Sequence, residues 1–379
     1  MKVLIVGAGI TGLTLANLLQ QKDINTSIVE KSPIITDSQY SIALWPAGSR
    51  VLKGLGLYEK YKESSIKIKE FSITTDSGSS LANYNMSNIL ADYGSLRTIV
   101  IGEFKKILID NFGREKIETG KTIKTILPSA NNVEVMFSDG GVKTYDLVVG
   151  CDGKNSIVRK GLFQKETIFK TNWSGWAWRV DAAIKDYNNK IQEIWGKGKF
   201  LSIFPANNGI FCFGAMPDSK INISADHATS EFIHSTFGKL GKDAAKLLSY
   251  QGNIKDISFW NFTDVRQPKW YQNRVVLLGD ACTSIIPVAS LGATAGMESA
   301  AVLADELGRT DSHHINHALK LYYKRHLERI NTIQKNSRKT VSWMFINGKF
   351  RTLERNLLIE MGSGVNFFKD IIDYMNEPI

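Results

Sequence analysis

The hydrophobic pattern at the start of the chain predicts a strand, a helix and a second strand. Residues 3–6 are apolar at successive positions, which is typical of a parallel strand buried on both faces. A helical pattern follows from about Ile10 to Gln21, and a second apolar run covers residues 26–29. This order is that of a parallel α/β unit.

The pattern changes over about residues 164–272. Segments such as "KFLSIFPANNGIFCFGAM" and "DISFWNFTDV" alternate apolar and polar positions, which predicts antiparallel strands. From residue 311 onward the spacing of apolar residues is helical, and "LERNLLIEMGSGVNFFKDIIDYM" is amphipathic enough to pack against other parts of the chain.

These patterns predict two lobes and a C-terminal segment. We expect an α/β lobe made of residues 1–75, 98–163 and 273–310, and a mainly antiparallel sheet made of residues 76–97 and 164–272. Residues 311–379 form the expected helical segment, which we expect to cross the two lobes.

Composition narrows the class of protein. The formal net charge is +10, but the Lys and Arg residues are dispersed and no nucleic-acid motif accompanies them, so we expect no nucleic-acid partner. The basic stretch from Lys320 to Arg355 has helical spacing, and we interpret it as a solvated helical face rather than a membrane-surface helix.

Cysteine usage and the absence of long apolar runs indicate the compartment. Cys151, Cys212 and Cys282 are far apart and show neither disulfide nor zinc spacing, so a reducing environment fits best. The N-terminus lacks the features of a signal peptide, and no apolar run reaches membrane-spanning length. We therefore expect a cytoplasmic protein with no transmembrane segment.

A glycine motif joins the first strand to the first helix. Gly7, Gly9 and Gly12 form Gly-x-Gly-x-x-Gly, which permits a tight turn and a close approach of backbone to a pyrophosphate. Glu30, at the end of the second strand, is placed to accept hydrogen bonds from a ribose. The alternative is an ordinary tight turn, but the complete order of strand, helix, strand and acid favours a dinucleotide site.

Two distant segments combine a strand with a glycine and an aspartate. "YDLVVGCDGKNSIVRK" contains Asp152, and "NRVVLLGDACTSIIPVASLGATAGMESAAVLADEL" contains Gly279 and Asp280. Either aspartate could be a helix N-cap. Asp280 follows an apolar strand, where ligands of parallel sheets collect, so we favour a cofactor role for it and leave both roles open for Asp152.

The three motifs, in this order, resemble those of the FAD-dependent aromatic hydroxylases, the single-component group A flavoprotein monooxygenases typified by para-hydroxybenzoate hydroxylase. The resemblance implies a Rossmann-type FAD-binding domain with an inserted antiparallel sheet that covers the substrate. With these motifs, the candidate FAD-binding residues are Gly7, Ala8, Gly9, Ile10, Thr11, Gly12, Glu30, Lys31, Arg97, Asp152, Gly279, Asp280, Pro287, Gly292, Ala293 and Thr294.

The antiparallel lobe supplies the candidate substrate residues. "WSGWAWRVD" is similar to a Gly-x-x-x-Trp-Arg strand of the family. The candidates are Trp176, Trp178, Phe204, Phe211, Phe213 and Met216, because pockets for aromatic compounds are mainly apolar. Alternation directs about half of such side chains to the cavity, and core packing is an equally good explanation for any one of them.

Three positions depart from the family pattern. Thr283 stands where many relatives have a histidine, and Ser290-Leu291-Gly292 replaces Gly-Gln-Gly. Ile101 occupies the position of a common arginine, and Arg97 is the nearest candidate to replace it, or else a surface charge.

The resemblance implies a monooxygenase that uses FAD, NAD(P)H and O2. In the family, NAD(P)H binds without a Rossmann domain of its own and reduces FAD, and the C4a-hydroperoxyflavin hydroxylates an aromatic or polycyclic small molecule. No catalytic side chain is identifiable, and a monomer or dimer is expected.

Three alternatives stay open. A flavin-dependent halogenase is disfavoured by Val180-Asp181 in place of Ile-Pro. An oxidase or a drug-inactivating monooxygenase would use the same parts. A non-catalytic flavin-binding sensor is also possible, because fold alone does not establish turnover.

Overall fold

The N-terminal lobe is built on a mainly parallel sheet. The computed structural model describes residues 1–36, 39–163, 166–181, 187–207, 209–221, 229–249, 254–288, 290–362 and 364–377. The strand order is β18 (Tyr271–Gln272), β19 (Val275–Leu277), β12 (Leu147–Gly150), β1 (Lys2–Val6), β2 (Asn25–Glu30) and β8 (Ile117–Thr119). β18 pairs antiparallel to β19, and the other neighbours pair parallel. The apolar run of β1 is buried on both faces, as its sequence predicts.

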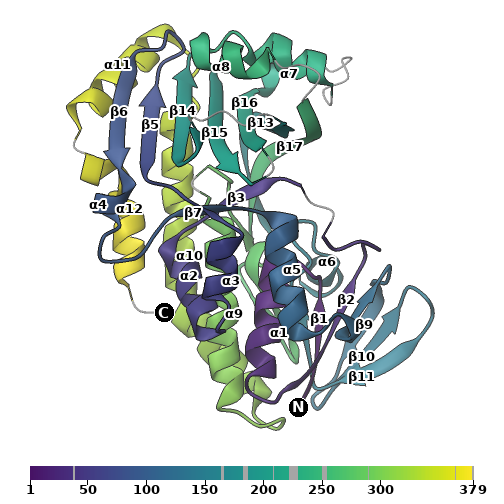
Figure 1. Ribbon diagram of the computed structural model, residues 1–379. Coiled ribbons are helices and arrows are strands. Elements are labelled where there is room, and N and C mark those ends of the chain that lie inside the picture. The colour runs from purple at the N-terminus through teal and green to yellow at the C-terminus, as the bar shows by residue number, and fades with distance from the viewer. Residues whose placement is uncertain are drawn as a thin grey trace.

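Helices pack beside this sheet. Figure 1 shows α1 (Ile10–Gln20), α5 (Ile101–Phe112) and α9 (Gly292–Gly308) side by side in the lower half of the molecule. Three shorter helices, α2 (Pro46–Gly54), α3 (Tyr58–Glu63) and α6 (Ile157–Leu162), complete this part. The expected fold class, an α/β lobe with an inserted, mainly antiparallel sheet and a C-terminal helical segment, is confirmed.

The second lobe is an eight-stranded sheet. Its order is β20 (Thr283–Ser284), β17 (Ile254–Arg266), β13 (Thr167–Val180), β16 (Gly209–Pro217), β15 (Lys199–Ala206), β14 (Lys190–Gly196), β5 (Glu70–Thr74) and β6 (Ser80–Asn85). All neighbours pair antiparallel except β14 and β5. β5 and β20 lie outside the boundaries expected for this lobe, because both strands are too short for alternation to identify them.

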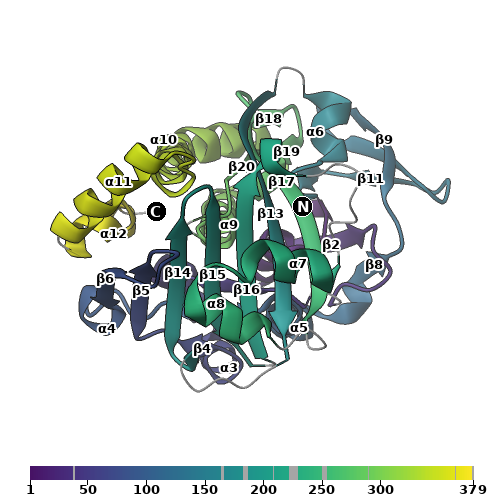
Figure 2. The ribbon, with the colours of Figure 1, turned by 90° about the horizontal axis from the view of Figure 1, so that it is seen from above.

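Two helices cover the outer face of this sheet. α7 (Ser230–Phe237) and α8 (Gly241–Leu248) lie across it in Figure 2, on the side away from the parallel sheet. Apolar side chains from both helices and from the strands form a separate core there. The inner face of the sheet is therefore the one that faces the N-terminal lobe.

Two small sheets were not expected from the sequence. β9 (Ile123–Pro128), β10 (Val133–Phe137) and β11 (Val142–Tyr145) form an antiparallel meander. β3 (Ser41–Leu44), β7 (Arg97–Val100) and β4 (Ile66–Lys67) form the other sheet, and α4 (Met86–Ile89) is a single turn after β6.

The C-terminal segment is helical, as its spacing predicts. It consists of α10 (Ile315–Met344), α11 (Lys349–Met361) and α12 (Gly364–Asn376). From α10, the Gln334 amide donates hydrogen bonds to the carbonyls of Val265 and Ser284, each at 3.0 Å. From α11, Arg355 Nη2 donates to the carbonyl oxygen of Trp195 in β14 at 2.7 Å. The segment thereby contacts strands of the large sheet along its length.

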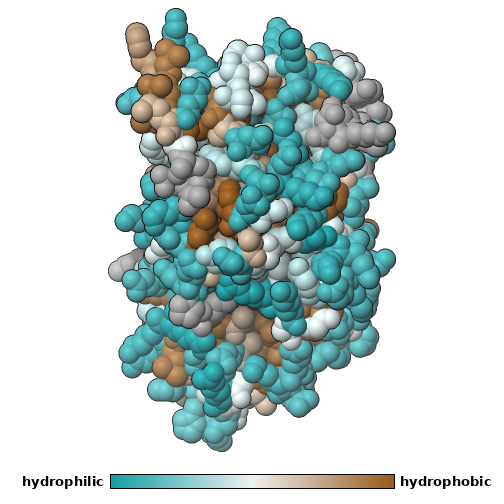
Figure 3. Space-filling model, turned by 60° about the vertical axis from the view of Figure 1, so that its left-hand side comes forward, coloured by the Kyte–Doolittle hydropathy of each residue, from teal (hydrophilic) through white to brown (hydrophobic). Residues whose placement is uncertain are grey.

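Several apolar side chains of α11 are exposed, next to charged ones. Phe350, Leu353, Leu357, Leu358 and Met361 are exposed, and Figure 3 shows apolar side chains gathered at the upper left, over this helix. Among the helices that the structure describes, none combines the length and the apolar character required to span a membrane.

Candidate active site

Packing within the fold explains two of the three glycines in the turn after β1, and open space lies beside the third. A Cβ added at Gly7, where φ is 106°, would lie 2.5 Å from the carbonyl oxygen of Cys151, and one at Gly12 would lie 2.1 Å from the carbonyl oxygen of Gly7. Both positions therefore require glycine for packing. A Cβ at Gly9 would meet no atom within 4 Å, so the backbone there faces space that another molecule can approach closely.

Two helices begin at this space. α1 starts after Gly9 and α9 after Leu291, and neither N-terminus has a capping side chain or an acidic residue in its first turn. The first backbone N–H groups of each helix are thus available to an anionic ligand, and the helix dipoles favour negative charge there.

Glu30 lies where the second strand ends beside the glycine turn. Its carboxylate accepts hydrogen bonds from the backbone N–H groups of Ala8 and Ser32, both at 2.8 Å. These bonds fix the side chain at the wall of an outer cavity of about 800 Å³, which Lys31 and Gly9 also line.

The position of Asp152 is compatible with both roles that the sequence left open. Its Oδ2 accepts hydrogen bonds from the N–H groups of Ile157 and Val158 at the start of α6, so the side chain caps that helix. Its Oδ1 is buried without a described partner, and the residue lines the outer cavity. Burial raises the pKa of Asp152. A buried acceptor of this kind suits a ligand hydroxyl group.

Asp280 lies at the carboxyl end of β19, in a second, central cavity of about 450 Å³. Burial raises the pKa of its carboxyl group to about 6, and the charge of Lys154 opposes that shift. Gly279 precedes it with φ of 55°, and a Cβ there would lie 2.8 Å from Thr11 Oγ1. Glycine thus lets this turn lie directly against α1.

The outer and central cavities form one path along the lobe. Both are lined by Gly9, Tyr40, Lys105, Cys151 and Gly153. Glu30 lies on the outer cavity, and Asp280 lies on the central one. The open backbone at Gly9, the two uncapped helix N-termini and the unpartnered Asp152 oxygen together fit an elongated dinucleotide such as FAD.

The residues of the loop before α9 are divided between the cavity and the core. Pro287, Gly292 and Ala293 line the central cavity. Thr294 is fully buried and its Oγ1 accepts a hydrogen bond from the Trp45 N–H at 3.4 Å, so it supports the loop from behind. Ser290 adopts φ of 51° and also lines the central cavity.

Arg97 has a structural role in the described chain. Its guanidinium donates to the Ser65 hydroxyl and to the carbonyls of Lys62 and Ser65, and it lines neither cavity. These three bonds hold it at the end of α3, so the structure does not support its expected contact with the flavin.

Lys105, which the sequence did not single out, lines both the outer and the central cavity. Lys105 lies one helical turn after Ile101 on α5, and both line the central cavity. Its Nζ donates to the carbonyl of Ile35 at 3.1 Å, and burial lowers its pKa while the charge of Glu30 opposes this. The four-residue spacing from Ile101, which puts both residues on one face of a helix, could have indicated Lys105 from the sequence.

The inner face of the large sheet closes the central cavity with aromatic rings. Phe204, Phe211 and Phe213 line it, together with Phe200 and Trp260. Phe204 and Phe211 are paired in register, with ring centroids 4.8 Å apart.

The other three candidates point away from this cavity. Trp176, Trp178 and Met216 belong to the core beneath α7 and α8, and Trp178 packs against Phe237 of α7 at 5.3 Å between centroids. Side chains alternate along a strand, so Ala177, between the two tryptophans, faces the cavity instead. The expectation that these three line the substrate site is therefore corrected.

The described residues hold no assembled metal centre. No group of three or more His, Cys, Asp and Glu side chains is placed to bind a metal ion within the described ranges, and the three cysteines are free and buried.

Comparison with known proteins identifies the family. Residues 1–337 match the model of the FAD binding domain family. The chain is 26% identical to an FAD-dependent urate hydroxylase of Klebsiella pneumoniae subsp. pneumoniae over 89% of each chain. It is 24% identical to the 3-amino-4-hydroxybenzoate 2-monooxygenase of Streptomyces cremeus over 80% of this chain and 77% of that protein.

A solved structure has the same fold. Klebsiella pneumoniae HpxO complexed with FAD and uric acid superposes with a TM-score of 0.89 at 22% identity, over 99% of this chain and 96% of that one. The expected resemblance and the expected enzyme class, an FAD-dependent monooxygenase, are confirmed. The chain belongs to the family defined by this FAD binding domain, whose model matches most of its length.

Proposed function

We propose that the protein is a single-component hydroxylase that consumes NAD(P)H and O2 to insert one oxygen atom into an aromatic or polycyclic small molecule. The observation that carries this proposal is the central cavity. Asp280 and the start of α9 line one side of it, and the aromatic face of Phe204, Phe211 and Phe213 lines the other.

The chain's own residues would divide the work. Gly9, the N-termini of α1 and α9, and Lys105 would bind the phosphate groups of FAD, while the Asp280 carboxylate would accept hydrogen bonds from the ribityl hydroxyl groups. The phenylalanine rings would orient a flat substrate and exclude water. When bound and reduced by NAD(P)H, FAD supplies the activation of O2 and the transfer of one oxygen atom.

The test is an anaerobic reduction experiment. Protein with bound FAD is mixed with NADPH or NADH, and flavin bleaching is followed with and without a panel of phenols and polycyclic aromatics. We expect one nicotinamide to bleach the flavin and one class of compound to accelerate bleaching. Aerobic mixtures should then yield a product heavier by one oxygen atom.

The opposite outcome has a definite meaning. If FAD is bound but no nicotinamide reduces it with any compound, the single-component proposal is wrong. Tight flavin binding with no turnover would then favour a sensor, and turnover only with an added reductase would favour a two-component enzyme.

A further inference from the structure

A third cavity of about 360 Å³ adjoins the central one. It lies between the inner face of the large sheet and the two C-terminal helices α10 and α12. Glu193, Ser202, Phe204, Val288 and Ser290 line both cavities and so form the junction between them. A molecule held against the aromatic face of the central cavity can therefore extend into the third cavity.

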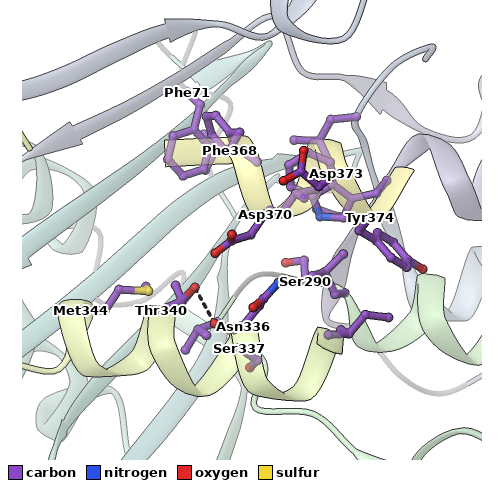
Figure 4. Close-up of a pocket in the computed structure, with 18 of the residues that line it drawn as sticks. Phe71, Ser290, Asn336, Ser337, Thr340, Met344, Phe368, Asp370, Asp373 and Tyr374 are labelled. Atoms are coloured by element: carbon purple, nitrogen blue, oxygen red, sulfur yellow. Dashed lines mark hydrogen bonds between the residues drawn. The ribbon is translucent and has the colours of Figure 1, made fainter. Parts of the chain in front are cut away.

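One part of the third cavity is aromatic and another is polar. Phe71 and Phe368 meet edge to face, with centroids 5.3 Å apart at 89°, and Trp45 packs on Phe368 at 6.0 Å. In Figure 4, Phe71 and Phe368 lie together, while α10 presents polar side chains across the space from α12. Such a cavity suits an aromatic compound with a polar substituent.

Acidic side chains line this cavity, and basic ones do not, among the described residues. Within the described part of the chain, its lining contains four carboxyl groups and no Lys, Arg or His. Three of the carboxylates are partly exposed and already have a cation: Asp370 pairs with Lys339, Asp373 with Lys369, and Glu377 with Arg329. The fourth, Glu193, forms no ion pair with any described residue.

Glu193 is the buried member of the set. Only 6% of the residue is exposed, and its Oε2 accepts a hydrogen bond from Trp195 Nε1 at 2.7 Å. It lies opposite Ser202 in the β14–β15 ladder, on the inner face of the sheet. Burial raises the pKa of its carboxyl group to about 8, and the Trp195 hydrogen bond opposes this. A negative charge here is costly unless a cation joins it.

We propose that Glu193 anchors the substrate at the junction of the two cavities, and that this substrate is an aromatic compound carrying a protonated amine. The inference rests on the proposed function, because it names the substrate class of that same site. The ammonium group would supply the cation that Glu193 lacks, and the ring would lie on the phenylalanine face. A substrate carboxylate at this point could not form this ion pair and would oppose the ionisation of Glu193, so it is disfavoured relative to an ammonium group.

The experiment compares three phenols that differ mainly in charge. Tyramine is cationic, 4-ethylphenol is neutral and 3-(4-hydroxyphenyl)propionate is anionic. Each is titrated into the FAD-loaded protein at pH 7.5 by calorimetry, and the change in flavin absorbance is recorded in parallel. We expect tyramine to bind about tenfold or more tighter than the propionate, which is the scale of a hydrogen bond to a charged group.

Two variants locate the effect. In Glu193→Gln, which keeps an acceptor for Trp195, the preference should shrink to within about threefold, while Glu63→Gln, at an exposed position outside the cavities, should retain it. The ranking by the wild-type protein needs no variant, so it decides even if Glu193→Gln does not fold.

The proposal fails if the propionate binds as tightly as tyramine, if Glu193→Gln keeps the preference, or if none of the three phenols binds. Binding does not require turnover, so these outcomes are separate from failure of the proposed function, which would appear as bound FAD that no nicotinamide reduces.

Discussion

Replacing Glu193 with Gln should change how the stability of the protein without FAD depends on pH. The carboxyl group has a pKa of about 8 in the fold, raised by burial, and an ordinary value of 4.5 in the unfolded chain. Between these values the folded chain keeps a proton that the unfolded chain releases. The free energy of unfolding therefore falls as pH rises through this interval, by about 1.4 kcal/mol per pH unit.

The magnitude follows from this interval. Between pH 5 and pH 8 the contribution of Glu193 to the free energy of unfolding should fall by about 3–4 kcal/mol, because the slope flattens near each pKa. The amide of Gln does not titrate, so the variant lacks this contribution. Buried groups such as Asp280 and His326 titrate in both proteins and cancel when the two are compared.

The assay is urea unfolding of both proteins at pH 5, 6, 7 and 8. The stability of Glu193→Gln relative to wild type should rise by about 3–4 kcal/mol across the series. Glu63→Gln, a change at an exposed position, is the control and should show no such trend. A relative stability of Glu193→Gln that stays constant with pH would refute the burial argument.

Three further experiments separate residues that bind the cofactor from residues that stabilise the fold. Gly9→Ala should leave the thermal midpoint of unfolding nearly unchanged but weaken the affinity for FAD at least about tenfold, as measured by equilibrium dialysis. Gly12→Ala should instead lower the free energy of unfolding by about 1–3 kcal/mol, because its Cβ meets backbone atoms. Equal losses of stability in the two variants would contradict this assignment. Lys105→Met should weaken FAD binding in a salt-dependent manner, whereas Lys106→Met, at the exposed neighbouring position, should not. If the two variants bind FAD with the same affinity, Lys105 does not contact the phosphate groups. Trp178→Ala should cost about 3–5 kcal/mol in urea unfolding without changing ligand affinity, and an altered ligand profile in a folded variant would place that ring at the cavity after all.

The sequence could predict the features whose chemistry is local. The strand, turn and helix around Gly7, Gly9 and Gly12 depend on near neighbours, and the structure places Glu30 and Asp280 on the cavities that those glycines border or support. The helical C-terminal segment followed from its spacing alone.

The sequence could not predict which face of the large sheet lines the central cavity. Alternation gives the period of a strand but not which half of it faces a cavity, and α7 and α8 decide that by covering Trp178 rather than Phe213. Lys105 and Glu193 could not be identified from the sequence, because their places on the cavities depend on how α5 packs and on how β14 pairs with β15. A single sequence does not reveal these tertiary contacts.

The third cavity also bears on how such enzymes can diverge. The family model ends at residue 337, yet Thr340, Met344, Phe368, Asp370 and Tyr374, all later in the chain, line that cavity. The part of the lining that α12 supplies is thus separate in sequence from the segments that line the outer and central cavities. If the third cavity holds part of the substrate, as proposed, mutations in α12 can change the substrate that is recognised without altering the residues on the outer and central cavities. New substrate specificities can then evolve in this segment.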